Sequence, residues 1–266
     1  MAAATRDAFL GGRVTAVQPV AGHHRAGLDA VLLASAFGAE TAGQVIDLGA
    51  GAGVAGMVLA ARAVNCTVTL AEREADLVAY AREAAGLAAN AAFGARLKPV
   101  SVDLLDPAAR TQSGLMPATF DHALMNPPFH DEGSVRVSPK AERARAHVLE
   151  AGGLDAWFRA ASALVKPGGT LAVILPAARL PDLLAGLAGR FGGVALLPIH
   201  PRPDEAAIRI LARGTKGSRA PLAILPGLKL HAAAGSAFGE AAQAILGDGA
   251  SLADVHMSWG ALAFPS

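Results

Sequence analysis

The fold of this 266-residue chain is decided by residues 44–53, which read Gln44-Val45-Ile46-Asp47-Leu48-Gly49-Ala50-Gly51-Ala52-Gly53. The apolar run before Gly49 has the length and composition of a buried strand, and three glycines follow it at alternate positions. Glycine lets the backbone turn tightly and approach a ligand where a Cβ atom would clash. A glycine loop directly after a buried strand predicts a ligand site at the carboxyl end of that strand.

From residue 44 onward, short apolar runs alternate with longer amphipathic ones, which is typical of βαβ units and a parallel sheet. We predict strands at 44–48, 66–71, 97–102, 120–125 and 169–175, and helices at 53–62, 74–89 and 153–165. The runs 194–197 and 207–211 have no helix-length segment between them, so they predict an antiparallel hairpin that closes the sheet. The predicted fold class is α/β: a doubly wound, mostly parallel, seven-stranded, Rossmann-like sheet with an antiparallel C-terminal hairpin.

The chain divides into three predicted regions. Residues 1–43 form an N-terminal segment, with a helix expected within 20–37 that caps the ligand site. Residues 44–214 form the α/β domain, and within it the polar, basic segment 130–150 predicts a loop. Residues 215–266 are rich in Ala and Gly and form an extension whose role the sequence leaves open.

Overall composition excludes several classes of protein. The N-terminus lacks a basic segment followed by an apolar one, and no apolar stretch reaches membrane-spanning length, so we expect a cytoplasmic protein without membrane contact. The single cysteine, Cys66, excludes an internal disulfide and a cysteine-cluster zinc site. Net charge is only +1, but residues 1–133 hold 9 Lys and Arg against 13 Asp and Glu, whereas residues 134–266 hold 14 against 9. This asymmetry fits a polyanion that docks on the C-terminal half.

A second motif, Asn126-Pro127-Pro128-Phe129, ends the apolar run 120–125. An exocyclic amine on a nucleobase is a poor nucleophile because its lone pair is delocalised into the ring. The side-chain oxygen of Asn126 and the carbonyl of Pro127 would accept its hydrogens and restore nucleophilicity. The two prolines stiffen the turn, and Phe129 offers a face on which the base stacks. We therefore predict that these four residues are the catalytic turn, with no metal, although an ordinary Asn-Pro turn is the structural alternative.

The cofactor is predicted from the residues around the glycine loop. Gly51, Gly53 and Gly56 match a dinucleotide fingerprint with Glu72 about twenty residues on, so NAD remains an alternative. Asp47, however, would crowd a pyrophosphate, whereas it suits a zwitterionic, sulfonium-bearing ligand such as S-adenosylmethionine, which we predict as the cofactor.

Two further carboxylates follow predicted strands. Glu72 ends the second strand, where it would accept hydrogen bonds from both ribose hydroxyls, or else begin a helix as an exposed charge. Asp103 follows the third strand, where it would accept from the adenine amino group while Leu104 packs on the ring. A helix N-cap is the competing interpretation of Asp103.

These motifs resemble those of class I S-adenosylmethionine-dependent methyltransferases of the Asn-Pro-Pro-Phe/Tyr type. More narrowly, the chain resembles the bacterial tRNA1(Val) adenine-N6-methyltransferase family, which modifies the adenine next to the anticodon. The likeness also covers residues 25–33, 164–169 and 198–202. It implies that Gly27 and Asp29 line the methionine end of the cofactor, and that the remaining cofactor contacts are Asp47, Gly49, Ala50, Gly51, Gly53, Glu72, Asp103, Leu104 and Asn126.

The expected reaction is transfer of a methyl group from S-adenosylmethionine to an exocyclic amine of RNA, with adenine N6 of a tRNA anticodon loop as the target. Open alternatives are a guanine-N2 ribosomal-RNA methyltransferase, whose second N-terminal domain this chain leaves no room for, an O-methyltransferase, a protein glutamine methyltransferase and a non-enzymatic RNA-binding protein. We expect RNA to contact basic residues of 136–145 and 202–219, namely Arg136, Lys140, Arg143, Arg145, Arg202, Arg209, Arg213, Lys216 and Arg219.

Overall fold

The computed structural model describes residues 3–20, 26–128 and 153–261. Phe129 and the basic residues of 136–145 lie outside these ranges. No helix within the described part of the chain is long and apolar enough to cross a membrane.

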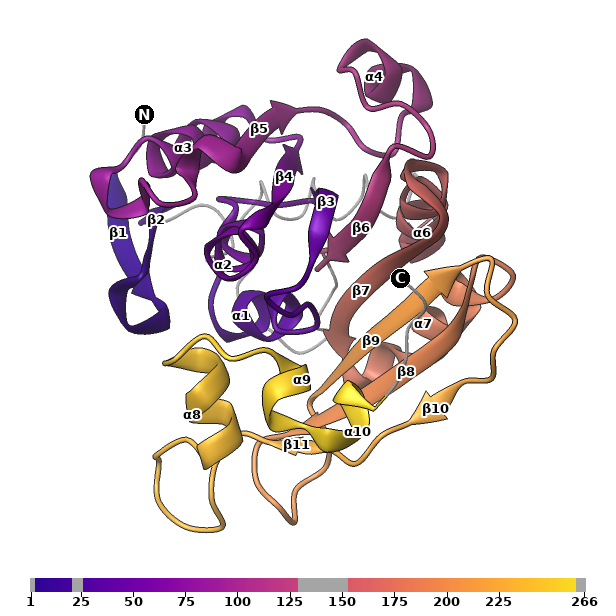
Figure 1. The fold of residues 1–266 in the computed structure, drawn as a ribbon. Coiled ribbons are helices and arrows are strands. Elements are labelled where there is room, and N and C mark those ends of the chain that lie inside the picture. Colours follow the sequence, from indigo (N-terminus) through magenta and orange to yellow (C-terminus); the bar gives the residue numbers. More distant parts are fainter. Residues whose placement is uncertain (1–2, 21–25, 129–152, 262–266) are drawn as a thin grey trace.

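A twisted sheet dominates the molecule (Figure 1). Its seven long strands are β3 (Ala42–Leu48), β4 (Asn65–Glu72), β5 (Leu97–Ser101), β6 (Phe120–Met125), β7 (Val165–Pro176), β8 (Phe191–His200) and β9 (Arg209–Lys216). They follow the order β5-β4-β3-β6-β7-β9-β8, and only β9 runs antiparallel to its neighbours. Two short strands, β10 (Ala223–Ile224) and β11 (Leu228–Lys229), pair with β8. The predicted doubly wound sheet and its antiparallel hairpin are confirmed.

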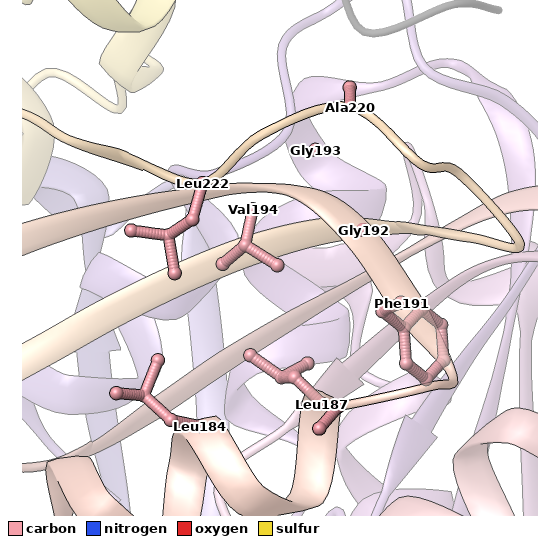
Figure 2. Close-up of a pocket in the computed structure, with 9 residues that line it drawn as sticks. Leu184, Leu187, Phe191, Gly192, Gly193, Val194, Ala220 and Leu222 are labelled. Carbon is pink, nitrogen blue, oxygen red and sulfur yellow. The ribbon is translucent and has the colours of Figure 1, made fainter.

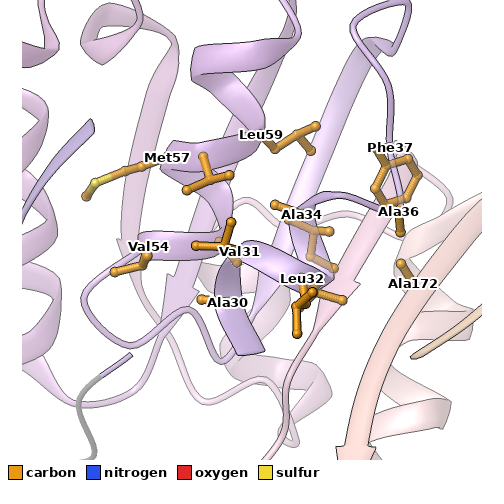
Figure 3. Packing of buried hydrophobic residues seen from close by; sticks show 14 of the residues in the cluster. Ala30, Val31, Leu32, Ala34, Ala36, Phe37, Val54, Met57, Leu59 and Ala172 are labelled. Atoms are coloured by element: carbon orange, nitrogen blue, oxygen red, sulfur yellow. The ribbon is translucent and has the colours of Figure 1, made fainter. Parts of the chain in front are cut away.

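The two faces of the sheet bury separate cores because successive strand residues point to opposite sides. In β3, Val45 contributes to one core, while Ile46 and Leu48 contribute to the other. The first core is covered by α1 (Leu28–Ala34), α2 (Val54–Arg62) and α3 (Ala75–Ala85), and Figure 3 shows side chains of α1 beside those of α2. The second is covered by α4 (Pro107–Gln112), α6 (Gly153–Leu164) and α7 (Leu180–Leu187). Short 3-10 helices lie at Leu10–Gly12, Ala88–Asn90, Gly94–Arg96 and Ala177–Arg179.

The N-terminal segment differs from the prediction. Residues Ala4–Phe9 (β1) and Val14–Pro19 (β2) form an antiparallel hairpin, and the helix expected within 20–37 begins only at Leu28. Asn90 fixes this hairpin to the domain, since its side chain accepts from the Thr15 N–H at 2.9 Å and donates to the Thr15 carbonyl at 2.7 Å. The glycine pair between the two strands was the available signal for a hairpin.

Two element boundaries also differ. The helix predicted at 74–89 ends at Ala85. Strand β7 begins at Val165, before the predicted start at residue 169, and contains the Lys-Pro-Gly-Gly segment 166–169. Gly168 has a φ of 79°, and the pairing with β6 shifts register between Phe120 and His122. The segment is thus an irregular part of the strand, because a bulge accommodates the backbone that would otherwise break the ladder.

The C-terminal residues pack on the first core through α8 (Glu240–Leu246), α9 (Leu252–Val255) and α10 (Met257–Gly260). Arg62, in the last turn of α2, links the C-terminal residues to the rest of the domain through hydrogen bonds. Its Nε donates to the Gly249 carbonyl at 2.8 Å and its Nη2 to the Ala250 carbonyl at 3.1 Å, while Nη1 donates to the Ala34 carbonyl at 2.7 Å. Burial lowers the pKa of Arg62 to about 10, so the guanidinium stays charged at neutral pH.

Replacing Arg62 with Met should destabilise the protein by about 2–4 kcal/mol, because several buried carbonyls lose a charged donor. Urea denaturation measures the loss, and hydrogen exchange should show faster exchange of backbone amides in residues 247–261. The control is Arg82→Met, since exposed Arg82 has one long bond of 3.5 Å to the Pro99 carbonyl. Equal stability of the two variants would contradict the fastening role of Arg62.

Candidate active site

The ends of three neighbouring strands meet at the point where strand order reverses. Leu48, the last residue of β3, pairs with Ala71 of β4 on one side and with Met125 of β6 on the other. The residues that come next, Gly49, Glu72 and Asn126, therefore lie together at the carboxyl edge of the sheet. In doubly wound sheets this edge is where ligands bind.

The glycine loop is held close to β4. The N–H groups of Gly49 and Ala50 both donate to the Ala71 carbonyl, at 2.9 and 3.0 Å. Gly49 has a φ of 72° and Gly51 a φ of 58°, which L side chains rarely adopt. A Cβ at Gly49 would come within 2.8 Å of the Trp157 ring, whereas one at Gly51 would meet nothing within 4 Å. Gly49 is thus needed for packing, and Gly51 presents bare backbone to open space.

Glu72 closes the loop from the next strand. Its Oε2 accepts the Gly51 N–H at 2.9 Å, and its Oε1 accepts the N–H groups of Arg73 at 2.7 Å and Glu74 at 2.9 Å. A carboxylate has about four lone-pair positions, so about one remains for a ligand hydroxyl. A ligand that takes both oxygens must share them with these backbone donors. The side chain is half-buried, and its orientation is fixed before any ligand binds.

Asp47 is 3% exposed and lies beneath the loop. Its Oδ2 accepts the Gly56 N–H at 2.9 Å, which ties the first turn of α2 to β3. Burial raises the pKa of Asp47 to about 7; the Gly56 N–H opposes that rise, and the nearby Glu72 carboxylate adds to it. The described hydrogen bond of this carboxylate is thus internal, and its contact with the ligand stays a prediction.

Asp103 and Leu104 lie just beyond β5. Oδ1 of Asp103 accepts the Leu105 N–H at 2.9 Å, which closes a turn. The helix that follows is capped instead by Asp106, whose Oδ1 accepts the Ala108 N–H at 2.8 Å. Leu104 is 4% exposed and belongs to the second core. The competing N-cap interpretation of Asp103 is wrong. Leu104, the next residue, packs in the second core.

Gly27 and Asp29 begin α1. Gly27 is exposed, and a Cβ there would meet no other atom within 4 Å. Asp29 is paired with Arg209 of β9, whose Nε lies 2.9 Å from Oδ2, and both side chains are largely buried. Because β9 is antiparallel, its first residue, Arg209, lies at the same edge of the sheet as the strand ends described above. Sequence reasoning did not find this ion pair, since 180 residues separate its members.

Asn126 carries an unpartnered buried acceptor. Among the described residues, its Oδ1 has no hydrogen-bond partner, and neither has Nε1 of Trp157, the side chain packed on Gly49. Buried polar atoms are normally satisfied, so among the described residues this pair leaves one donor and one acceptor available beside the glycine loop. Pro127 is buried and Pro128 is exposed. Sequence reasoning did not single out Trp157, because its only local signal is a place in the apolar face of α6.

The predicted basic group at 202–219 does not form one surface. Arg213 pairs in register with Ala172 in mid-strand, its guanidinium lies 4.8 Å from the centre of the Phe37 ring, and it donates to the Ala36 carbonyl. Lys216 donates to the Val165 carbonyl at the start of β7, which is the amino edge of the sheet. Neither residue therefore lies at the carboxyl edge with Gly49, Glu72 and Asn126, because residues of one strand alternate and advance about 3.4 Å each.

The amino edge holds a different feature. A cavity of about 160 Å³ lies between α7 and the start of β8, and Figure 2 shows Leu184, Leu187 and Val194 directed into it. Its lining is apolar. None of the predicted site residues contributes to it, so it belongs to another part of the molecule.

Comparison with known proteins shows which family of proteins the chain resembles. A model of the family described as "methyltransferase small domain" matches residues 13–196. A tRNA1(Val) (adenine(37)-N6)-methyltransferase from Porphyromonas gingivalis is 32% identical over 193 residues, which cover 71% of this chain and 73% of that enzyme.

Two solved structures share the fold. A structure described as a predicted O-methyltransferase from Agrobacterium tumefaciens is 35% identical, with a TM-score of 0.71, over 84% of this chain and 97% of that one. The T. thermophilus 16S rRNA N2 G1207 methyltransferase, solved with AdoMet and guanosine, is 22% identical, with a TM-score of 0.53, over 80% of this chain and 50% of that one. The fold is that of class I methyltransferases.

Replacing Asp47 with Asn should change how stability depends on pH. Between pH 4 and pH 7 the folded wild type holds a proton on Asp47 that the unfolded chain has lost, so its free energy of unfolding falls as pH rises. Asp47→Asn has no carboxyl group at this position, so its free energy of unfolding does not show this decrease with pH. The stability of Asp47→Asn relative to wild type should therefore increase with pH, by at most about 1.4 kcal/mol per pH unit.

Urea denaturation of both proteins from pH 4.5 to pH 7.5 measures this difference. Taking the difference cancels the opposite contribution of His122, whose pKa is lowered by burial to about 4. Asp76→Asn, at an exposed position in α3, is the matched control. A difference for Asp47→Asn that does not change with pH would contradict the raised pKa of Asp47.

Proposed function

The chain belongs to the methyltransferase small domain family, whose members use S-adenosylmethionine, and from that premise we propose that it methylates an exocyclic amine of a nucleobase in RNA. The target we propose is N6 of an adenine in a tRNA anticodon loop. The unpartnered Oδ1 of Asn126, beside the glycine loop, is the observation that carries this proposal.

The residues at the carboxyl edge fit the cofactor. The open space at Gly51 leaves room for a ligand against the backbone, and the remaining acceptor position of Glu72 suits a ribose hydroxyl. We propose that Gly27, Asp29, Gly49, Ala50, Gly51, Gly53, Asp103 and Leu104 complete this site, with Asp47 supporting the loop from below. When bound, S-adenosylmethionine supplies a methyl group on an electrophilic sulfonium.

The role of the protein side chains in this reaction is to position the amine for attack on the methyl group. A bond forms between the amine nitrogen and the methyl carbon while the sulfur–carbon bond breaks, and the amine then loses a proton to solvent. Asn126 Oδ1 and the Pro127 carbonyl would accept the two N–H groups of the amine and direct its lone pair toward the methyl group. Phe129, which lies outside the described residues, would stack on the base. Such acceptors act mainly in the transition state.

Other groups that could accept the methyl group can be distinguished from adenine N6. The likeness to the T. thermophilus structure, at 22% identity, extends to the fold alone, but guanine N2 is also an exocyclic amine and is the second candidate. A hydroxyl acceptor, as the description of the A. tumefaciens structure suggests for that protein, carries one hydrogen and would use one acceptor rather than two. The P. gingivalis relative supports adenine in tRNA over both.

The proposed reaction is tested with Asn126→Ala. Turnover on an unmodified tRNA1(Val) transcript should fall about 100-fold or more, while the dissociation constant for S-adenosylmethionine stays within about twofold. Nucleoside mass spectrometry identifies the product as N6-methyladenosine. Asn65→Ala, at an exposed position on the amino side of β4, is the control. Methyl incorporation into guanosine, or wild-type turnover by Asn126→Ala, would overturn the assignment.

The cofactor site is tested with Glu72→Gln. The substitution should weaken S-adenosylmethionine binding by about 1.5–3 kcal/mol, because charge-assisted hydrogen bonds to both the ligand and the Gly51 N–H are lost. Isothermal titration calorimetry measures the affinity directly. Glu74→Gln is the matched control, since Glu74 is two residues away and forms an ion pair with Arg73. Unchanged affinity in Glu72→Gln would remove this residue from the site.

A further inference from the structure

A second cavity, of about 340 Å³, lies in the C-terminal part of the chain. It is formed where β11 joins the end of β8 and where α8 begins, and its lining includes Lys229, His231, Glu240 and His256. None of these residues belongs to the cofactor site or to the catalytic turn. In Figure 1, β11 and α8 lie side by side below the central sheet.

The lining offers a cation and an aromatic ring. Lys229 is exposed and forms no ion pair or hydrogen bond with another described residue. The ring of His231 is stacked on Phe238, with centroids 4.9 Å apart and 16° between the planes. Its Nδ1 lies 3.1 Å from the Ala237 carbonyl, which can only accept, so Nδ1 carries the proton and Nε2 remains for a ligand.

The other polar groups around the cavity have separate roles. His256 is occupied at both nitrogens, by the Pro226 carbonyl at 2.8 Å and the Trp259 N–H at 3.2 Å, and is structural. Arg202 donates to the Ala232 carbonyl at 3.0 Å and the Gly235 carbonyl at 2.8 Å, and so braces the loop that holds His231. Glu240 is exposed and is not paired with Lys229, which leaves its carboxylate as an acceptor.

The cavity opens at the same edge of the sheet as the candidate active site. Lys229 pairs with His200, the last residue of β8, and β8 is separated from β6 by β7 and β9. Lys229 itself lies one strand further out, in β11, and the four strand spacings from β6 correspond to about 19 Å, a distance that a few nucleotides of single-stranded RNA can bridge. A strand whose target base enters beside Asn126 can therefore reach this cavity.

We propose that this cavity binds one nucleotide that flanks the methylated base in the substrate RNA. This inference rests on the proposed function, in which the substrate is RNA. Lys229 contacts a phosphate, the imidazole of His231 packs against the base, and Glu240 accepts from an exocyclic amino group of that base. Sites for single-stranded RNA combine cations for the backbone with rings for the bases, and this lining has both within one concave surface. The C-terminal residues thereby extend the RNA site beyond the catalytic edge.

The first test uses AMP as the probe. In a heteronuclear NMR titration of the full chain, AMP should shift the signals of Lys229, His231 and Glu240 in the millimolar range, and Lys229→Ala should weaken this binding about fivefold or more. Lys98→Ala is the matched control, because Lys98 is an exposed lysine in β5, at the far side of the sheet. Absence of AMP-induced shifts at the cavity in the wild type would overturn the nucleotide site.

The second test uses the tRNA1(Val) transcript. Lys229→Ala should raise KM for tRNA about fivefold to tenfold with kcat and cofactor affinity unchanged, and should lower the salt slope of RNA binding by about 0.7. Ala232→Trp, at an exposed position on the cavity wall, should raise KM without removing a charge. Wild-type KM in both variants would overturn the proposal. If the wild type methylates no tRNA, the proposed function fails, and the AMP titration alone decides the cavity.

Discussion

The central position of β3 is the constraint on which the rest of the structure depends. β3 pairs in parallel with β4 on one side and β6 on the other, with Leu48 aligned to Ala71 and to Met125. This register brings the glycine loop, Glu72 and Asn126 to one edge, although 77 positions separate Gly49 from Asn126 in the chain. A slip of one residue would exchange the two faces of the strand, so Val45 and Ile46, each buried in a different core, hold the register in place.

Two carboxylates keep the glycine loop in shape. Asp47 fixes the start of α2 from below, and Glu72 fixes Gly51 from the side. Their environments differ, since Asp47 is buried and Glu72 keeps part of its surface in solvent. Burial raises the pKa of Asp47, whereas Glu72 is held by three backbone donors and retains a lone pair for a ligand. The two acids therefore hold the glycine loop in shape from two sides, through the Gly56 N–H and the Gly51 N–H.

The direction of the strands separates functions along the sheet. The carboxyl edge holds the glycine loop, Asn126, the Asp29–Arg209 ion pair and the cavity beside Lys229. The amino edge holds Lys216 and an apolar cavity. Basic residues that are close in sequence thus have unlike roles: Arg202 braces a loop, Arg209 neutralises Asp29, and Arg213 lies over Phe37. The pairing of Lys229 with His200, the last residue of β8, places the Lys229 cavity at this same carboxyl edge.

By itself, the sequence determined the strand order along the chain, the glycine loop after β3 and the Asn-Pro-Pro turn after β6, because hydrophobic runs and glycine or proline breaks are local properties. It failed for the β1–β2 hairpin, whose first strand has no buried residue, and for the packing of residues 217–261, whose Ala- and Gly-rich composition carries little periodicity. Only the tertiary structure decided which charges are paired and which polar atoms are left over: Asp29 with Arg209, Glu72 with Gly51, and Asn126 Oδ1 with none of the described residues. Such pairings depend on strand register across the sheet, and register is fixed by burial of both faces rather than by neighbours in sequence.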